Sequence, residues 1–545
     1  MRNRRTASLV AMGVAATLLP ALTPAAASAA APAFRAAAAA DPLKQYTQQK
    51  PKWKRCDAQT PANFECATIK VPLDYGRPDG GKLDVAISRT RATSAKDRRG
   101  VLLLNPGGPG GIGLDMPLYL ASELPDAVKK RYDLIGFDPR GVGQSSPVGC
   151  GLNDDDLNWQ RPYKAETFDK DVRWARTVAE KCRKRNGAVL PHLSTRNTAR
   201  DMDVIRAVLG EKRISYLGYS YGTYLGAVYA QLFPKGADRF VLDSAADPER
   251  IWRGMIQVWA EGAEPAFTRW TEWTAARNAT YGLGSTPAEV RATFWNLVAG
   301  ANRKPIAFDG LLLSGDDIRS WRAMFFYVAD AAETVAQLRD AAAGKAPTAA
   351  PSRSGPPTAP ARPSFARSVP ADNGDASFWS VVCADTRAWP RDPEQYRRDA
   401  IRDKAAYPLY GDFASHIKPC AFWGQGAEPA TKVNNTVRAL VLQNEWDSQT
   451  PLVSGQGMRR AMKGSRMITV LDGVGHGVYG SGSCADKFTT AYLVTGRLPL
   501  KDLTCRTPAN QRLDGLRLPP TALPGLPALP GLPGLPGLPG RQDRF

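Results

Sequence analysis

Histidine is scarce in this chain, and its scarcity limits the chemistry that the chain can support. Three histidines occur in 545 residues, and no two cysteines have the C-x-x-C spacing. Metal sites draw mainly on histidine, cysteine and carboxylate ligands at characteristic spacings. We therefore expect no metal and no other cofactor.

Long apolar runs are missing after the N-terminal segment. No later stretch approaches the run of about 18 uncharged apolar residues that a membrane-spanning helix needs. Basic residues are in excess, with a formal net charge of +20, but no basic run alternates with aromatic residues. Nucleic-acid recognition is therefore not expected. The basic surface is either simply solvated or adheres to anionic cell-wall polymers.

The N-terminal 29 residues have the organisation of a secretory signal peptide. Three arginines are followed by an apolar run from Ala7 to Leu22 and by Ala27-Ser28-Ala29, which has small residues at the cleavage-site spacing. Arg4-Arg5 leaves a twin-arginine route open, and the general export route is preferred. No cysteine near this site would carry a lipid anchor. We expect a soluble, secreted, extracellular protein with a net charge of +17 once the three arginines are removed.

Eight cysteines in an exported chain favour disulfide bonds. Proximity along the chain suggests four local bridges, although many connectivities are possible. The predicted couples are Cys56 with Cys66, Cys150 with Cys182, Cys383 with Cys420, and Cys484 with Cys505.

A serine stands in a turn between a predicted strand and a predicted helix. Residues 214–217 resemble a short strand, Gly218-Tyr219-Ser220-Tyr221-Gly222 has the G-x-S-x-G pattern, and residues 223–233 are predicted to be a helix that Pro234 ends. Glycines in such a turn let the two backbones approach closely while the serine hydroxyl is held clear of the sheet. The pattern predicts Ser220 as a nucleophile, and an ordinary glycine-rich turn is the alternative.

A glycine-rich loop follows an earlier predicted strand. The strand at residues 101–105 runs into Asn105-Pro-Gly-Gly-Pro-Gly-Gly-Ile-Gly113. Such a loop frees backbone amides to point at one spot, as the oxyanion of an acyl-transfer reaction requires. We predict the donors to be the amides of Gly108 and Tyr221; a loop without this role is the alternative.

Strands and helices alternate along most of the chain. A helix is predicted at residues 197–209, with Thr198 and Asp201 as its capping pair and Gly210 as its stop. The alternation predicts an α/β fold with a doubly wound, mostly parallel sheet. The other predicted strands are residues 67–71, 83–88, 133–138, 240–244, 437–443 and 467–471, the last of these taken as the final strand.

The alternation fails from about residue 249 to residue 431. This segment is predicted to be helical, holds nine of the thirteen tryptophans and contains the Pro-, Ala- and Ser-rich stretch 344–375. We interpret it as a cap inserted in the sheet domain, with 344–375 as a disordered loop. Its tryptophans form either a core or a substrate pocket.

A nucleophilic serine needs a base, and the base needs an acid that fixes its tautomer. His476 is preferred as the base because it lies on a glycine-flanked loop just after a predicted strand, whereas His192 precedes a helix and His416 lies in the cap. Asp447, after the penultimate predicted strand, is preferred as the acid over Asp243. The order Ser, Asp, His is that of the α/β-hydrolases.

The motifs together resemble those of the secreted bacterial tripeptidyl aminopeptidases, relatives of the proline iminopeptidases within the α/β-hydrolase fold. The resemblance runs from about Trp53 to Cys505 and is carried by the loop 105–111, Gly136-Phe-Asp-Pro-Arg-Gly-Val-Gly143, Asn197-Thr-Ala-Arg-Asp-Met-Asp203, the Ser220 turn, and the Asp447 and His476 loops. It implies a serine exopeptidase that releases tripeptides from free peptide N-termini.

An exopeptidase of this kind must hold the substrate's ammonium group at a fixed distance from the nucleophile, which a partly desolvated carboxylate can do. Glu264 and, just upstream, Glu261 are the candidates in the cap. Pro265 is predicted to be the first residue of a helix that contains Phe267 and Trp270, so Glu264 would otherwise serve only to complement the helix dipole.

Two other classes of function remain open. A secreted esterase or lipase, or a proline iminopeptidase-like hydrolase, would use the same triad and differ in what the cap admits. A catalytically silent binding protein is disfavoured because all three triad positions are filled.

The sequence thus predicts six segments. These are a signal peptide at 1–29, a flexible segment at 30–50, an α/β-hydrolase core in two parts at 51–248 and 432–510, the cap at 249–431, and a Leu-Pro-Gly-rich tail at 511–545 that would form an extended spacer or a wall-associating arm.

Overall fold

The computed structural model describes residues 41–345 and 368–507, and all the elements below belong to the unit that begins at Pro42. The predicted signal peptide, most of the N-terminal segment, most of the Pro-rich stretch 344–375 and the predicted tail lie outside the described residues.

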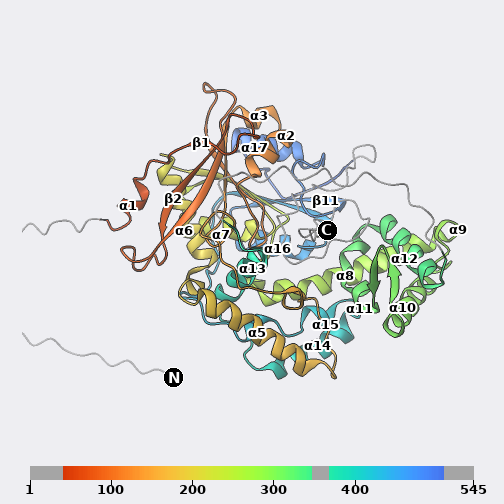
Figure 1. Ribbon diagram of the computed structural model, residues 1–545. Helices are drawn as coiled ribbons and strands as arrows, with labels where there is room; N and C mark the ends of the chain where they lie inside the picture. The colour runs from red at the N-terminus through yellow and green to blue at the C-terminus, as the bar shows by residue number, and fades with distance from the viewer. Residues whose placement is uncertain (1–40, 346–367, 508–545) are drawn as a thin grey trace, which may run out of the picture. The chain divides into compact units, whose positions relative to one another are not determined.

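A ten-stranded sheet organises this unit, in the order β1-β2-β3-β5-β4-β6-β7-β10-β11-β12. Its strands β1, β2 and β11 are labelled in Figure 1. The pairs β1/β2, β2/β3 and β3/β5 are antiparallel, and every pair from β5/β4 to β11/β12 is parallel. The predicted mostly parallel sheet is thereby confirmed. Its strands are β1 (Lys54–Arg55), β2 (Phe64–Pro72), β3 (Lys82–Thr90), β4 (Gly100–Asn105), β5 (Tyr132–Phe137), β6 (Ile214–Tyr219), β7 (Ala237–Asp243), β10 (Ala439–Trp446), β11 (Arg466–Val474) and β12 (Leu503–Arg506).

Both faces of the sheet are buried, and β4 is accordingly apolar from Val101 to Leu104. In β4, Val101 and Leu103 pack into one core cluster, whereas Leu102 and Leu104 pack into another. This alternation follows from the two-residue period of a strand. The first cluster contains residues of α6 (Thr195–Val208), α7 (Tyr221–Leu232) and α16 (Leu452–Ala461), and the second contains residues of α2 (Met116–Glu123), α3 (Asp126–Lys129) and α17 (Asp486–Thr495).

The chain between β7 and β10 is mostly helical, as the predicted cap requires. Its boundaries at 249 and 431 stay a prediction. This insertion contains α8 (Arg253–Ala275), α9 (Asn278–Tyr281), α10 (Pro287–Arg303), α11 (Gly315–Ser320), the 3₁₀ turn η4 (Arg322–Phe326), α12 (Val328–Ala342), α13 (Asn373–Ala384), α14 (Pro393–Ala406) and α15 (Gly411–Ala414). It also contains a two-stranded antiparallel sheet, β8 (Ile306–Phe308) with β9 (Leu311–Leu313), which was not predicted. The remaining α-helices of the unit are α1 (Lys44–Thr47), α4 (Asp154–Leu157) and α5 (Phe168–Asn186).

Residues 467–471 do not form the last strand of the sheet, so this prediction is wrong. The strand β12 follows and pairs in parallel with β11. Only four residues long and alternately half-buried and exposed, β12 lacks the apolar run that would have indicated it.

The predicted cap of α6 is also wrong. Ser194 is the N-cap, and its hydroxyl accepts the amide of Asn197. Thr198 and Asp201 lie inside the helix, where Asp201 forms a buried ion pair with Arg140 at 2.6 Å. Asp201 is therefore placed by a long-range charge pair rather than by helix capping.

Four disulfide bonds join the eight cysteines as Cys56–Cys66, Cys150–Cys182, Cys383–Cys420 and Cys484–Cys505. These are the couples that are neighbours along the chain. Among the helices that the structure describes, none is both long and apolar enough to cross a bilayer.

Candidate active site

Ser220 occupies the turn between β6 and α7, as the G-x-S-x-G pattern predicts. Its φ of 57° and ψ of −125° lie in a region that residues other than glycine rarely adopt. At Gly222, a Cβ would lie 2.7 Å from Oδ1 of Asn105 and 3.0 Å from that residue's carbonyl oxygen. The turn therefore requires a residue without a side chain at this position, which explains the second glycine of the pattern.

The loop after β4 lies directly against the Ser220 turn. A Cβ on Gly107 would lie 2.9 Å from Cβ of Ser220 and 3.4 Å from the amide nitrogen of Tyr221. The amide of Gly107 donates to Oδ1 of Asn105 at 3.0 Å. Among the described residues, the amides of Gly108 and Tyr221, the predicted oxyanion donors, have no protein acceptor. Tyr221 begins α7, where helix amides lack intrahelical partners.

His476 and Asp447 come together at the same edge of the sheet. Asp447 follows β10 directly, and His476 stands two residues beyond β11, its parallel neighbour. Nδ1 of His476 lies 2.9 Å from each carboxylate oxygen of Asp447. Nε2 of His476 is buried and has no hydrogen-bond partner among the described residues. The ring is thus held from one side, and its second nitrogen is left for another group.

The carboxylate of Asp447 is completely buried, yet it is held in the charged form. Burial acts to raise its pKa, but the neighbouring His476 and several hydrogen bonds more than compensate and lower the pKa below its usual value. Oδ1 accepts the amides of Gln449 at 2.8 Å and Thr450 at 2.9 Å, and Oδ2 accepts the Thr450 hydroxyl at 3.0 Å. A charged acid in this place fixes the tautomer of the imidazole.

Asp243, the alternative acid, has a different place. Its carboxylate accepts the amides of Val478 at 2.9 Å and Tyr479 at 2.7 Å, so it anchors the chain that follows His476. Burial raises its pKa to about 7, and these two bonds only partly oppose the rise. Its carbonyl oxygen accepts the amide of Ser220 at 3.0 Å. The end of β7 thus links the serine turn to the histidine loop.

Two residues that no sequence motif singled out support the histidine loop. The Ser244 hydroxyl accepts the amide of Gly477 at 2.8 Å. The side-chain amide of Asn444 donates to the carbonyls of Gly475 and Gly477 at 3.0 and 3.1 Å. Ser244 follows β7 directly, and Asn444 lies near the end of β10. This position near the carboxyl end of a strand is the one sequence signal that could have indicated their role. Glu445, one residue after Asn444, accepts the amide of Asp472 at 2.7 Å.

The other two histidines are used elsewhere. His416 is buried, and its Nε2 lies 3.2 Å from Oδ2 of Asp171 on α5. His192 ends a short 3₁₀ turn before α6. Burial lowers the pKa of both imidazoles. Of the three histidines, the one that contacts a predicted acid is His476.

The predicted helix start at Pro265 is wrong. The helix α8 begins at Arg253, and Pro265 lies in its interior. Proline in a helix removes a hydrogen bond, but α8 buries twelve residues, including Trp259, Phe267 and Trp270, and this burial maintains the helix.

The two cap carboxylates do not mark a helix N-terminus. Oε1 of Glu264 accepts the amide of Leu409 at 2.6 Å, and burial raises the pKa of this carboxyl. Glu261, one turn earlier, pairs with Arg250 at 2.7 Å. The dipole explanation for Glu264 therefore fails, because the residue lies in the middle of α8.

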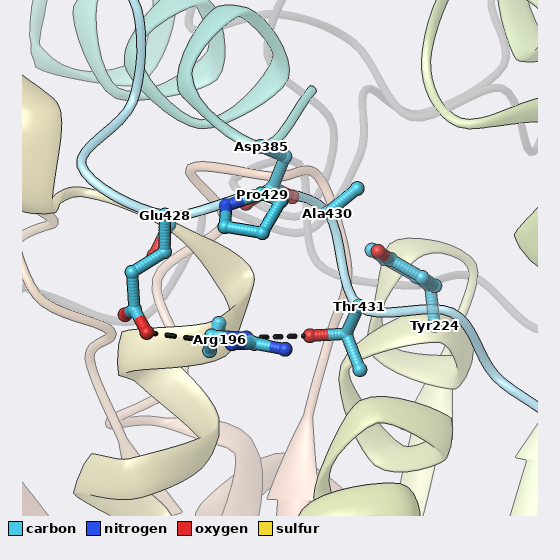
Figure 2. A pocket seen from close by; sticks show the side chains of 8 residues that line it. Arg196, Tyr224, Asp385, Glu428, Pro429, Ala430 and Thr431 are labelled. Carbon is cyan, nitrogen blue, oxygen red and sulfur yellow. Dashed lines mark hydrogen bonds and ion pairs between the residues drawn. The ribbon is translucent and has the colours of Figure 1, made fainter. Parts of the chain in front are cut away.

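A small pocket is lined by the start of α6, by α7 and by residues of the insertion, as Figure 2 shows. Neither Ser220, Asp447 nor His476 lines it, so it is not the candidate active site. The lining residues are Ser194, Arg196, Tyr224, Asp385, Glu428, Pro429, Ala430 and Thr431. Arg196 connects to Glu428 at 3.3 Å and to the Thr431 hydroxyl at 2.9 Å.

Asp385 in this pocket reaches the residue after the serine through one intermediary. It accepts the Thr195 hydroxyl at 2.5 Å and the Trp252 indole at 3.0 Å. The same Thr195 hydroxyl lies 2.9 Å from the hydroxyl of Tyr221. Burial raises the pKa of Asp385 to about 6, against the lowering effect of these hydrogen bonds. A residue of the insertion thus supports the serine turn indirectly, through Thr195 and the side chain of Tyr221.

Comparisons with known proteins agree with this arrangement. Residues 100–297 match the family described as alpha/beta hydrolase fold, and residues 407–505 match the family described as TAP-like protein. The tripeptidyl aminopeptidase of Streptomyces lividans is 35% identical over 478 residues, covering 84% of this chain and 87% of the relative.

Two further relatives come from Mycobacterium tuberculosis. The serine protease Hip1 is 30% identical over 509 residues, covering 84% of this chain and 91% of the relative. Carboxylesterase B is 29% identical over 486 residues, covering 83% and 89%. Since the first relative exceeds 30% identity over most of both chains, this protein belongs to the tripeptidyl aminopeptidase family of the α/β-hydrolase fold and is a serine hydrolase of the peptidase type.

Proposed function

We propose that this protein is exported and releases tripeptides from the free N-termini of peptides, with Ser220, His476 and Asp447 as its catalytic triad. The observation that carries the proposal is the Asp447–His476 pair at 2.9 Å, on loops at the sheet edge where the strained Ser220 turn also lies. Parallel strands place their carboxyl ends at one edge of a sheet, where ligands bind in α/β folds.

In the proposed reaction, Nε2 of His476 takes the proton of the Ser220 hydroxyl as Oγ attacks the scissile carbonyl carbon. The amides of Gly108 and Tyr221 hold the oxyanion that forms. His476 then passes the proton to the leaving amine, and an acyl-enzyme remains. Water, deprotonated by the same imidazole, hydrolyses the ester and regenerates Ser220. Asp447 stays ionised throughout and stabilises the imidazolium.

We further propose that Glu264, assisted by Glu261, binds the substrate's ammonium group. One oxygen of Glu264 is occupied by the Leu409 amide, which fixes the carboxylate and leaves its second oxygen to accept another donor. Burial raises the pKa of Glu264 although Arg291, Arg319 and Lys404 attract its charge. An ammonium group on the substrate would stabilise the charged carboxylate further through a charge-assisted hydrogen bond.

Export is proposed from two features. The N-terminal 29 residues have signal-peptide organisation, and the four disulfide bonds suit an oxidising compartment. Association with anionic wall polymers through the basic surface is part of this proposal.

An esterase is the second candidate, because a relative at 29% identity is named carboxylesterase B. Turnover of a free tripeptide anilide, its N-acetylated form, a prolyl anilide and a short acyl ester separates the candidates. The proposal predicts that the free tripeptide anilide is the best substrate and that acetylation lowers kcat/KM by about ten- to hundredfold. Equal cleavage of the free and acetylated tripeptides, or preference for the ester, would contradict it.

A further inference from the structure

The loop that carries Asp447 is held by the helical insertion as well as by the sheet. Three successive carbonyls of this loop accept hydrogen bonds from buried side chains. The Ser448 carbonyl accepts a hydrogen bond from Nη1 of Arg322 at 2.6 Å. The Gln449 carbonyl accepts one from the Trp259 indole at 2.7 Å. The Thr450 carbonyl accepts one from the side-chain amide of Gln443 at 2.7 Å. Gln443 belongs to β10, whereas Arg322 and Trp259 belong to the insertion, in η4 and α8.

Two of these carbonyls share a peptide group with an amide that binds Asp447. The Ser448 carbonyl and the Gln449 amide form one peptide unit, and the Gln449 carbonyl and the Thr450 amide form the next. Both amides donate to Oδ1 of Asp447, at 2.8 and 2.9 Å. Because a peptide unit is planar, fixing its carbonyl also fixes the direction of its N–H. A donor on the carbonyl also polarises the unit and strengthens its N–H as a donor.

Arg322 is an unusual group to find in this position. Its guanidinium is almost fully buried, and no carboxylate within the described part of the chain forms an ion pair with it. It lies over the rings of Trp259 and Tyr410, 4.8 and 5.0 Å from their centroids. Burying a cation is costly unless nearby groups compensate. Here the compensation comes from the two rings, the Ser448 carbonyl and attraction to the charge of Asp447.

We infer that Arg322 and Trp259 are positioning residues, through which the insertion orients the acid of the triad by way of two peptide planes. The inference rests on the proposed triad and gives the insertion a second role. Besides carrying the proposed ammonium-binding residue Glu264, the insertion completes the hydrogen bonding of the Asp447 loop, on which His476 depends.

Arg322→Met and Trp259→Phe test the inference. Trp259→Phe removes the indole donor, and Arg322→Met removes the guanidinium, which donates to the Ser448 carbonyl and to Oε1 of Gln449. Both substitutions keep much of the side-chain volume. We expect kcat for a free tripeptide anilide to fall by about ten- to hundredfold in each variant, while KM changes by less than about twofold, because the acid acts only on the chemical steps. The rate at which a fluorophosphonate labels Ser220 should fall by the same factor. Arg322→Lys keeps a charged donor and should retain more of kcat than Arg322→Met.

Matched controls exist elsewhere in the fold. Trp389→Phe removes an equally buried indole that donates to the Val382 carbonyl at 2.8 Å, and Arg239→Met removes a buried guanidinium that donates to the Leu493 carbonyl. Both controls should lose stability but keep kcat. If Arg322→Met fails to fold, Trp259→Phe, which keeps most of the ring, carries the test.

Two results would overturn the positioning role, and a third would overturn the proposed function. Wild-type kcat in folded Trp259→Phe or Arg322→Met, or a rise in KM without a fall in kcat, overturns the positioning role. A loss of kcat in the controls equal to that in the test variants also overturns it. Full activity in Ser220→Ala overturns the proposed function instead, so the two failures are distinguishable.

Discussion

At the scale of single residues, the site depends on a few groups held against their intrinsic preferences. Ser220 has a positive φ, and Asp447 is charged in a fully buried place. Asp447 is stabilised by hydrogen bonds from Gln449, Thr450 and His476. Such local costs are typical of positions at which chemistry takes place.

Replacing Ser220 with Ala tests the nucleophile. If the hydroxyl is the attacking group, as proposed, kcat should fall by about four to six powers of ten while the far-ultraviolet circular dichroism stays unchanged. A fluorophosphonate should label the wild-type peptide that contains Ser220 and no other peptide. Near-normal turnover by the folded variant would refute the assignment.

Replacing Glu264 with Gln tests recognition of the amine. The change removes the proposed charge-assisted contact, which would contribute about 1.5 to 3 kcal/mol, so kcat/KM for a free tripeptide anilide should fall by about ten- to hundredfold. Acetylating the substrate should add little to this defect, since both changes break one interaction. Turnover of a neutral ester by the variant serves as the control and should hardly change. Additive losses would show that Glu264 acts on something other than the amine.

At the scale of elements, disulfide bonds hold short segments such as β12 and the 3₁₀ turn at Pro419–Ala421. Cys505 lies in β12, which ends the sheet, and bonds to Cys484 just before α17. The bond Cys383–Cys420 joins α13 to the 3₁₀ turn at Pro419–Ala421. A crosslink restricts the unfolded chain and typically stabilises a protein by about 2–4 kcal/mol.

Digestion of the native protein without reductant should release four linked peptide pairs, one for each couple. Replacing Cys484 and Cys505 together with Ala should lower the free energy of unfolding by about 2–4 kcal/mol, measured by urea denaturation. A thiol titration that finds close to eight free thiols in the native protein would show the pairing to be wrong.

At the scale of the whole molecule, a buried charged group of the insertion binds the helices that pack on the sheet. Asp385 lies at the C-terminal end of α13, yet its carboxylate binds Thr195 of α6 and approaches Tyr221 of α7 through it. Burial raises the pKa of Asp385 to about 6, above the value near 4 that it has in an unfolded chain. Between these two pH values the folded state binds more protons than the unfolded state. Through this group, the wild type is therefore most stable below pH 4 and loses stability as the pH rises through 6.

Asp385→Asn removes this titration. The variant loses some hydrogen bonding at every pH, because the Asn side-chain amide meets donors on Thr195 and Trp252. Its free energy of unfolding relative to wild type should nevertheless improve as the pH rises from 4 to 7, by about 1–3 kcal/mol. Urea denaturation of both proteins at several pH values measures this difference. A difference that is constant with pH, or that moves the other way, would contradict the raised pKa.

Local patterns in the sequence were enough to predict the mostly parallel sheet, the serine turn and the glycine-rich loop. Each depends on a short run of residues whose steric or apolar character sets the backbone, such as the glycines around Ser220. The small number of histidines limited the candidates for the base to three, and the glycine-flanked loop just after a predicted strand favoured His476 among them. Neighbouring cysteines likewise suggested the couples that the structure joins.

The tertiary structure decided what depends on contacts between distant segments. Asp243 ends β7 and Asp447 follows β10 at the same edge of the sheet. Only the fold shows that Asp447 contacts the imidazole while Asp243 binds the amides beyond it. It also placed Pro265 inside a helix, because burial of α8 outweighs a lost hydrogen bond. The contacts of Arg322 and Trp259 with the Asp447 loop span 126 and 190 residues. No periodicity or motif in the sequence indicates such a long-range contact, because the two partners come together only when the chain between them has folded.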